Sequence, residues 1–464
     1  MRRAAIPQVA VVPALLAVIV FAIDMLSPSG MTADSLRQVS TAVDLVHHHT
    51  IGLDPVWHYQ VNPQVGVTFV HHHVYPYFPW GGALFAVPWV IVYDIAHKLG
   101  IGPGSIALVK QGHDWPIQVI SMSTVVALTT VVVYLIALRM LEIQPVSRRR
   151  GWAAVIALGF AFCTPAWPIA SRSLWEHGPS MLFLSLALLF ALRARQGERG
   201  WTGMGVALGC SYAMRPTDAI PIAVLGLWVL GWQRRHALKV IVGAVPPLAI
   251  LFTVDWVAYR QLLTPYYTQG QGFQISSTFR TALAGNLVSP GRGLFIYVPL
   301  VALSAWGLWI LHRSGRLDPF WIAVACVPVV HWIVISAFKH WWAGDSYGNR
   351  LFTDMMPFFV LLAMPAFEHL ASRPLRTQRV ATSFVSVAVV WCLFVQGQGA
   401  TLRSAWCWNN EPTDVDVHSS KVWSWSDPQF LRGVRRIVWG PNRHSELIRD
   451  GVDKIGCPVE PVRP

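Results

Sequence analysis

Charged side chains are scarce in this sequence. Asp, Glu, Lys and Arg make up 13% of the 464 residues, whereas hydrophobic residues make up 54%. A soluble domain has roughly a quarter charged residues, so the shortage excludes a soluble globular protein of this length. The mean hydropathy of +0.44 points the same way. The composition therefore predicts a polytopic membrane protein.

Cysteine is also sparse, with six residues in the chain. Four of them fall within apolar runs, where cysteine acts as a small core residue: Cys163, Cys210, Cys326 and Cys392. The other two, Cys407 and Cys457, fall in a C-terminal tail that we expect to lie outside the cell, where a disulfide can persist. Two alternatives stay open for this pair: a disulfide candidate or two free thiols.

Neither a cleavable signal peptide nor a nucleic-acid-binding region is indicated. The first apolar run, at about 5–26, is too long for a signal-peptide core and lacks an A-x-A-like cleavage site, so we expect an uncleaved anchor. The net charge of +13 lies largely in short loops, where Lys and Arg set orientation and meet anionic head groups. We expect membrane lipids, and not nucleic acid, as partners.

Apolar runs that cross a bilayer need about 17 to 25 residues. The sequence predicts about eleven of them, at about 5–26, 117–138, 152–170, 179–193, 202–216, 219–233, 239–258, 294–312, 318–338, 351–370 and 380–398. The runs 202–216 and 219–233 are short and could be broken or tilted. The expected fold class is an all-α polytopic membrane protein.

Lys and Arg recur in every second loop between these runs. The basic groups are Arg2 and Arg3; Arg148, Arg149 and Arg150; Arg193, Arg195 and Arg199; Arg234, Arg235 and Lys239; Arg313 and Arg316; Arg373, Arg376 and Arg379. The positive-inside rule makes those loops cytoplasmic. We therefore expect a cytoplasmic N-terminus and an extracytoplasmic C-terminus.

One further apolar run, 80–97, must not cross if that pattern is to hold. It contains Pro88 and Asp94, and we expect a juxtamembrane or re-entrant helix in the outer interface. A transmembrane domain then covers 1–398, with a long first external loop at 27–116. The external tail at 399–464 is small for an independent domain, so we expect it to cover the site or to bind part of a substrate.

The unusual polar and aromatic residues gather on the predicted external side. They include Asp34, Asp54, Trp80, Trp175, Glu176, His177, Arg215, Arg292, Lys339, Trp341, Trp342, Asp345 and Arg350. Each has a plainer interpretation, since Asp34 could cap an interfacial helix, Arg215 could reach the interface, and the tryptophans could be interfacial anchors. A transporter would place such groups at mid-membrane in repeated halves, and no internal repeat is seen.

Two histidine triplets, 47–49 and 71–73, lie in the first external loop. Imidazole suits zinc and other transition metals, so the low-ranked metal candidates are His47, His49, His71 and His73. Consecutive side chains point in different directions, and no Cys, Asp or Glu completes a metal-binding spacing. Metal use stays unknown.

The order of these features resembles the C-type (GT-C) glycosyltransferases, polytopic enzymes that take sugars from polyprenyl-phosphate carriers. Asp34, Ala42, Leu45 and Gly52 match a loose acidic motif that follows the first span in this superfamily. Further similar segments are YPYFPWGGALFAVPW at 75–89, LWEHGP at 174–179, SPGRGLFIYVP at 289–299 and WWAGDSYGNRLFTDMMP at 341–357. The resemblance covers about residues 1–400. It departs at Ser35, where many members carry a second acid.

The resemblance implies an inverting glycosyltransferase that moves a hexosyl or pentosyl group to an extracytoplasmic glycan, glycolipid or protein. Asp34 is then the catalytic base, with Arg215, Arg292, Arg350 and Lys339 as donor-phosphate ligands. Supporting or second acid roles fall to Glu176, His177, Asp345 and Asp54, and sugar stacking to Trp80, Trp175, Trp341 and Trp342. No cofactor is required, a divalent cation is possible, and the protein would serve cell-envelope biogenesis in the inner (plasma) membrane.

Two rival functions remain. A glycan ligase would need a large late external loop, and the loop at 259–293 is modest. A lipid-linked glycan transporter or flippase would need ionisable residues at mid-membrane. The donor sugar, the acceptor, the lipid length and the oligomeric state are not indicated.

Overall fold

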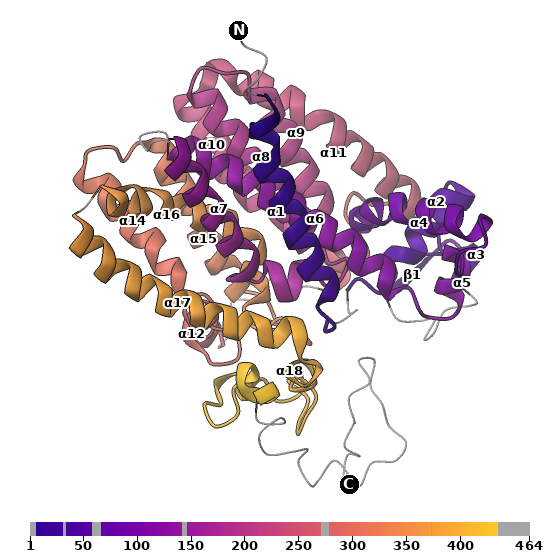
Figure 1. Ribbon diagram of the computed structural model, residues 1–464. Coiled ribbons are helices and arrows are strands. Elements are labelled where there is room, and N and C mark those ends of the chain that lie inside the picture. Colours follow the sequence, from indigo (N-terminus) through magenta and orange to yellow (C-terminus); the bar gives the residue numbers. More distant parts are fainter. Residues whose placement is uncertain are drawn as a thin grey trace.

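The computed structural model describes residues 6–30, 34–57, 66–141, 146–270, 278–372 and 374–434. Within these ranges the chain is mostly helical, and its sheet is one antiparallel hairpin of β1 (Val67–Val70) and β2 (His73–Pro76), in which Val67 pairs with Pro76. Figure 1 shows the long helices side by side, with the N-terminus at one end of the bundle and α18 at the other.

Eleven helices follow the eleven predicted apolar runs. They are α1 (Ile6–Leu26), α6 (Trp115–Met140), α7 (Val146–Phe162), α8 (His177–Arg195), α9 (Trp201–Met214), α10 (Ala219–Trp232), α11 (Ala237–Tyr259), α14 (Ala302–Arg313), α15 (Pro319–Ser336), α16 (Met356–Ala371) and α17 (Leu375–Thr401). Among the described residues six helical stretches are long and apolar enough to cross a membrane: Trp115–Met140, His177–Arg195, Arg234–Tyr259, Pro319–Ser336, Arg350–Leu370 and Gln378–Thr401. The protein is therefore a multi-pass membrane protein, and the total of eleven crossings stays a prediction.

Glycine allows a close helix contact between α9 and α11. A Cβ on Gly205 would lie 1.9 Å from the carbonyl oxygen of Val240, and one on Gly243 would lie 2.2 Å from that of Thr202. Small residues let backbones approach in lipid, where apolar burial gives helices little reason to associate. Since α8 also packs on α9, the ends of these three helices are brought together.

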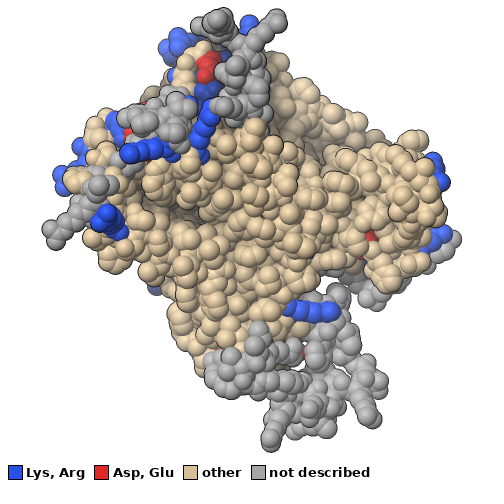
Figure 2. Space-filling model, viewed as in Figure 1, with Lys and Arg blue, Asp and Glu red and all other residues tan. Residues whose placement is uncertain are grey.

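On the face that Figure 2 shows, Lys and Arg gather mainly at the end where α1 begins, with a few at the lateral edge and at the opposite end. The middle of the bundle shows almost no charged side chain on this face. A band of this kind fits the apolar interior of a bilayer. The orientation of the chain across the membrane stays a prediction.

The first loop builds a lobe beside the long helices (Figure 1). It contains α2 (Gln38–His48), α3 (Asp54–Trp57), the hairpin, α4 (Ala83–Lys98) and α5 (Ser105–Lys110). Helix α4 covers the run 80–97 and packs on α2 and α6. At 16 residues it is as long as α16 and longer than α9, α10 and α14, so its juxtamembrane position stays a prediction.

The described part of the tail folds back onto the bundle. Beyond α17, α18 (Arg403–Cys407) and two short 3-10 turns lie near α12 (Phe279–Val288) and α13 (Leu294–Tyr297). A cluster of buried aliphatic and aromatic side chains joins the tail to α12 and to the loop after α15: Ala282, Trp341, Trp342, Trp408, Val415 and Val422. The tail is thus packed against the loops that follow α11 and α15.

The cysteines follow the predicted division only in part. Cys163 and Cys392 are buried and free, while Cys210 is half-buried and Cys326 is exposed on the helix surface. Cys407 is disulfide-bonded. Its expected partner, Cys457, lies outside the described residues, so the pairing itself stays a prediction.

Candidate active site

A cavity of about 560 Å³ lies where six helices begin or end. α8, α10 and α16 start beside it, and α9, α11 and α15 finish beside it. Neighbouring helices that run in opposite directions place the start of one beside the end of the next. Loops that are far apart in sequence therefore converge at this cavity. The ionisable and hydroxyl side chains of the wall are Asp34, Glu176, His177, Tyr212, Arg215, Thr217, Tyr266, Tyr267, His340, Asp345, Arg350 and Asp416.

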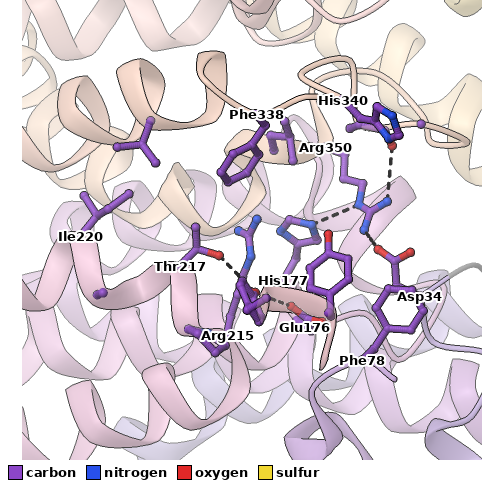
Figure 3. Close-up of a pocket in the computed structure, with 18 of the residues that line it drawn as sticks. Asp34, Phe78, Glu176, His177, Arg215, Thr217, Ile220, Phe338, His340 and Arg350 are labelled. Atoms are coloured by element: carbon purple, nitrogen blue, oxygen red, sulfur yellow. Dashed lines mark hydrogen bonds and ion pairs between the residues drawn. The ribbon is translucent and has the colours of Figure 1, made fainter. Parts of the chain in front are cut away.

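Arg350 lies at the centre of this wall, between Asp34 and His177 (Figure 3). Its Nη2 donates to Asp34 Oδ2, its Nε donates to His177 Nε2 at 3.1 Å, and its Nη1 reaches the carbonyl oxygen of Ala343 at 3.5 Å. The guanidinium lies 4.0 Å from the ring centroid of Trp175, a cation–π distance. The Asp34 side chain keeps 22% of its surface exposed, so a ligand can reach it.

A buried carboxylate, Asp354, connects the second arginine to this group. Asp354 Oδ1 lies 3.0 Å from His177 Nδ1, and Oδ2 lies 2.5 Å from Arg215 Nη1. Since arginine can only donate, Nε2 of His177 accepts from Arg350, and the ring proton must be on Nδ1, where it is donated to Asp354. Asp34, Arg350, His177, Asp354 and Arg215 therefore form one continuous polar network.

Glu176 differs from Asp34 in its surroundings. Burial raises the pKa of Glu176 to about 8, against an opposing effect of Arg215, and Asp34 raises it further. Tyr267 Oη donates to Glu176 Oε2 at 3.4 Å and also lies 3.3 Å from Thr217 Oγ1. At neutral pH the Glu176 side chain is thus a neutral acid that can donate a hydrogen bond.

The lobe of the first loop and the tail each add one wall. The backbone N–H of Tyr266 donates to the carbonyl oxygen of Tyr77 at 3.2 Å, which holds Phe78 at the cavity. From the tail comes Asp416, whose Oδ1 accepts from Trp342 Nε1 at 2.7 Å. The cavity is therefore completed by segments from both ends of the chain.

The structure brings six of the residues selected from sequence into one cavity: Asp34, Glu176, His177, Arg215, Asp345 and Arg350. Lys339 is exposed and does not line the cavity. Asp54 lies in the lobe, where it accepts from Val74 N at 3.0 Å and lies 3.1 Å from His73 Nδ1. Neither residue is placed to meet a ligand that contacts Asp34.

Arg292 also lies outside the cavity, and protein acceptors use its guanidinium completely. Its N–H groups donate to the carbonyl oxygens of Gly291, Trp342 and Gly344 and to the side-chain oxygens of Asn409 and Gln429. Five donors are all that a guanidinium has. Arg292 joins the loop after α15 to the tail, and no N–H remains for a phosphate.

The four tryptophans selected as sugar-stacking candidates are buried behind the wall. Trp80 donates from Nε1 to Asp255 Oδ1 at 2.8 Å, and Trp175 supports Arg350. Trp341 and Trp342 belong to the tail cluster. None of these rings lines the cavity, and its aromatic surface comes from Phe78, Tyr212, Tyr266, Tyr267 and Phe338.

The histidine triplets do not converge on a common centre. His47 lies 2.8 Å from Asp94, and His73 is paired with Asp54; His49 and His71 both have positive φ in turns. Across the described part of the chain no group of three or more His, Cys, Asp or Glu side chains is placed to hold a metal ion.

Sequence reasoning missed Asp354 and Asp416, whereas Phe78, Tyr266 and Tyr267 lie in segments that it placed on the external side without giving them a sugar-binding role. Asp354 lies four residues after Arg350, within the similar segment at 341–357, but it also belongs to the apolar run 351–370 that the sequence predicts to cross the membrane. A 3-10 turn, Arg350–Met355, directs its carboxylate back to His177. An acid inside an apolar run is a signal that could have identified it.

Comparison with known proteins gives a structural likeness of low degree. No family model matches the chain, and no curated protein matches it. Among solved structures it is similar to ArnT from Cupriavidus metallidurans, crystallised with undecaprenyl phosphate, at a TM-score of 0.46 and 16% sequence identity. The match covers 83% of this chain and 64% of ArnT. A likeness of this degree assigns no activity.

Proposed function

We propose that the chain is a GT-C-like membrane glycosyltransferase that moves a sugar from a polyprenyl-phosphate carrier to an acceptor at the extracytoplasmic face. The observation that carries the proposal is the cavity at the helix ends, where the accessible carboxylate of Asp34 meets the guanidinium of Arg350, with Arg215 in the same wall. Such transfer needs a base for the acceptor and cations for the leaving phosphate.

In the proposed reaction, the acceptor hydroxyl oxygen attacks the anomeric carbon of the sugar while its proton passes to Asp34. The bond between that carbon and the phosphate oxygen breaks, and its electron pair leaves with the lipid phosphate. Attack and departure occur on opposite faces of the carbon, so configuration inverts. Asp34 is better suited than Glu176 to accept the proton, because Glu176 is already protonated below pH 8.

Arg350 and Arg215 are the proposed phosphate ligands. Among the described residues Arg215 has one hydrogen-bond acceptor, Asp354, so its other N–H groups are left for a ligand. Arg350 is held by Trp175 and His177 on one side and by Asp34 on the other. A phosphate that binds to Arg350 competes with Asp34 for the guanidinium and frees the carboxylate to act as a base.

The remaining wall suits the lipid part of the donor. Ile220, Leu263, Val334 and Phe338 line the cavity at the ends of α10, α11 and α15. Figure 3 shows Ile220 on the opposite side of the cavity from Asp34 and Phe78. Polar chemistry and apolar surface are thus separated across one cavity, as an amphipathic polyprenyl phosphate requires.

The test compares membranes that contain the wild type, Asp34→Asn or Asp54→Asn at matched levels of folded protein. A panel of radiolabelled polyprenyl-phosphate sugars is supplied with native membrane acceptors, and the label transferred is counted. We expect the wild type and Asp54→Asn to transfer one sugar and Asp34→Asn to transfer none. Asp54→Asn is a matched control because it changes an acid of the same loop outside the cavity.

Each other outcome is informative. Equal transfer by wild type and Asp34→Asn would remove Asp34 from catalysis. No transfer from any donor, with acceptor shown to be present, would reject the transferase and favour a transporter or flippase.

A further inference from the structure

A second cavity lies at the opposite ends of the helices that build the candidate site. It has a volume of about 980 Å³ and lies between the α8–α9 turn and the α10–α11 turn. Its charged lining residues are Arg195, Glu198, Arg199, Arg235 and Lys239, with His236 beside them. Four cations and one acid thus share one wall.

The single acid of this wall does not neutralise its cations. Glu198 is bound by Arg139 at 2.6 Å and by Arg193 at 2.9 Å, neither of which lines the cavity. Arg195 is paired with Asp318. Within the described ranges Arg199, Arg235 and Lys239 form no ion pair. Three positive charges therefore remain.

Helix α9 begins at this cavity and adds to its positive field. It starts at Trp201, and its N-cap residue, Gly200, has no side chain that could accept from the first turn. Helix N-termini carry partial positive charge and unpaired N–H groups. Cations placed there are unfavourable, so an anion would relieve both the charge and the unsatisfied donors.

The surroundings of the cavity indicate that the anion is attached to a lipid. Large apolar side chains are exposed immediately next to it on α10 and α11: Trp232 at 63%, Leu238 at 70% and Val242 at 56%. A free phosphate makes no favourable contact with an apolar surface, whereas the acyl chains of a lipid pack against it. Basic pockets between transmembrane helices on the cytoplasmic side are suited to anionic head groups.

We propose that this cavity binds the phosphate of an anionic lipid head group through Arg199, Arg235, Lys239 and the N-terminus of α9. The acyl chains then lie along the exposed faces of α10 and α11. The proposal does not depend on the transferase proposal, because it concerns another cavity and another ligand.

The test uses the full chain purified in a neutral detergent. Phosphatidic acid or phosphatidylcholine is added, and retained lipid is measured by native mass spectrometry for wild type, for the triple variant Arg199→Gln, Arg235→Gln, Lys239→Gln, and for Arg148→Gln, Arg150→Gln, Arg313→Gln. The second triple variant is the control, because it removes as many positive charges from the same end of the molecule, outside the cavity.

We expect the wild type and the control to retain phosphatidic acid but not phosphatidylcholine. Each lost cation should weaken binding about fivefold, so the cavity variant should bind phosphatidic acid about a hundredfold more weakly. Equal losses of binding in both triple variants would overturn the proposal and indicate a general attraction to the charged surface. If the wild type retains no phosphatidic acid, the proposal is also overturned. Displacement of bound lipid by inorganic phosphate at similar concentration would show that the site takes free phosphate and would overturn the lipid assignment.

Discussion

Arg292 and Arg350 occupy two regions that look alike in sequence and differ in three dimensions. Both follow small-residue loops, in SPGRGLF and SYGNRLF, and both are selected from sequence as phosphate ligands. Arg292 lies where the tail meets the loop after α15, a contact that we call the tail junction. There, every N–H of its guanidinium donates to a protein oxygen. In the cavity, Arg350 makes one contact from each nitrogen, one of them to a partly exposed carboxylate.

The difference shows that the number of guanidinium N–H groups bound by protein oxygens distinguishes a structural arginine from one that is available to a ligand. A guanidinium has five donors; when protein acceptors take all of them, the residue fixes the fold. When some remain, or when a partner is itself reactive, the residue is available for chemistry. The following changes are chosen to break or sharpen this contrast between the tail junction and the cavity.

The largest effect is expected from Arg292→Met. The change removes the guanidinium donor from the carbonyl oxygens of Gly291, Trp342 and Gly344, each loss costing about 1 to 3 kcal/mol, and we expect a loss of about 4 kcal/mol in the free energy of unfolding. The measurement is the thermal midpoint in detergent, together with limited proteolysis of the tail. Arg403→Met, at an exposed position of α18, is the matched control and should change neither. An unchanged midpoint for Arg292→Met would end the structural assignment.

Arg350→Gln should show the opposite behaviour. Because the change removes a cation placed where the leaving phosphate gathers charge, we expect transfer to fall about a hundredfold in kcat/KM, with a thermal midpoint near that of the wild type. Arg350→Lys keeps the charge without the planar fork and should recover part of the loss. If Arg350→Gln instead unfolds the protein and Arg292→Met inactivates it while it stays folded, the two roles have been exchanged.

Several residues of the cavity can be predicted from sequence alone, because the membrane topology places their loops on one side. Asp34 follows α1, Glu176 precedes α8 and Arg215 follows α9; when basic loops mark alternate helix ends, the remaining loops must meet on one side. What sequence does not show is which acceptors surround each side chain. The side-chain acceptors of Arg292 come from Asn409 and Gln429, more than a hundred residues away, and such contacts depend on how the tail packs.

The tryptophans illustrate the same limit. Their position near helix ends fits either a sugar-stacking surface or an interfacial anchor. In the structure the ring of Trp175 lies under the guanidinium of Arg350, and the indole N–H of Trp80 donates to Asp255. The tyrosines at 266 and 267 form the wall instead, because the chain after α11 turns back over the cavity.

Glu176 gives a pH-dependent test within the cavity. Its pKa, raised to about 8 mainly by burial, keeps it protonated and neutral below that pH. As pH rises through about 8 the side chain becomes negative beside Asp34 and the donor phosphate, so we expect kcat/KM for transfer to fall on the alkaline side. Glu176→Gln, which stays neutral and still donates, should remove this alkaline decline and leave the rate at pH 7 nearly unchanged. A decline that persists in Glu176→Gln belongs to another group.

The smallest expected effect concerns Tyr267, whose hydroxyl donates to Glu176 and lowers its pKa slightly against the effect of burial. Tyr267→Phe removes that donor, so the pKa of Glu176 should rise and the alkaline decline should shift upward by a fraction of a unit. Tyr266→Phe is the control, because Tyr266 lines the same cavity but makes no hydrogen bond to Glu176 among the described contacts. A downward shift in Tyr267→Phe, or equal shifts in both variants, would mean that the hydroxyl acts on a group other than Glu176. A selective upward shift would show that Glu176 is held neutral by the cavity, in contrast to Arg292, whose charge is balanced by fixed protein dipoles.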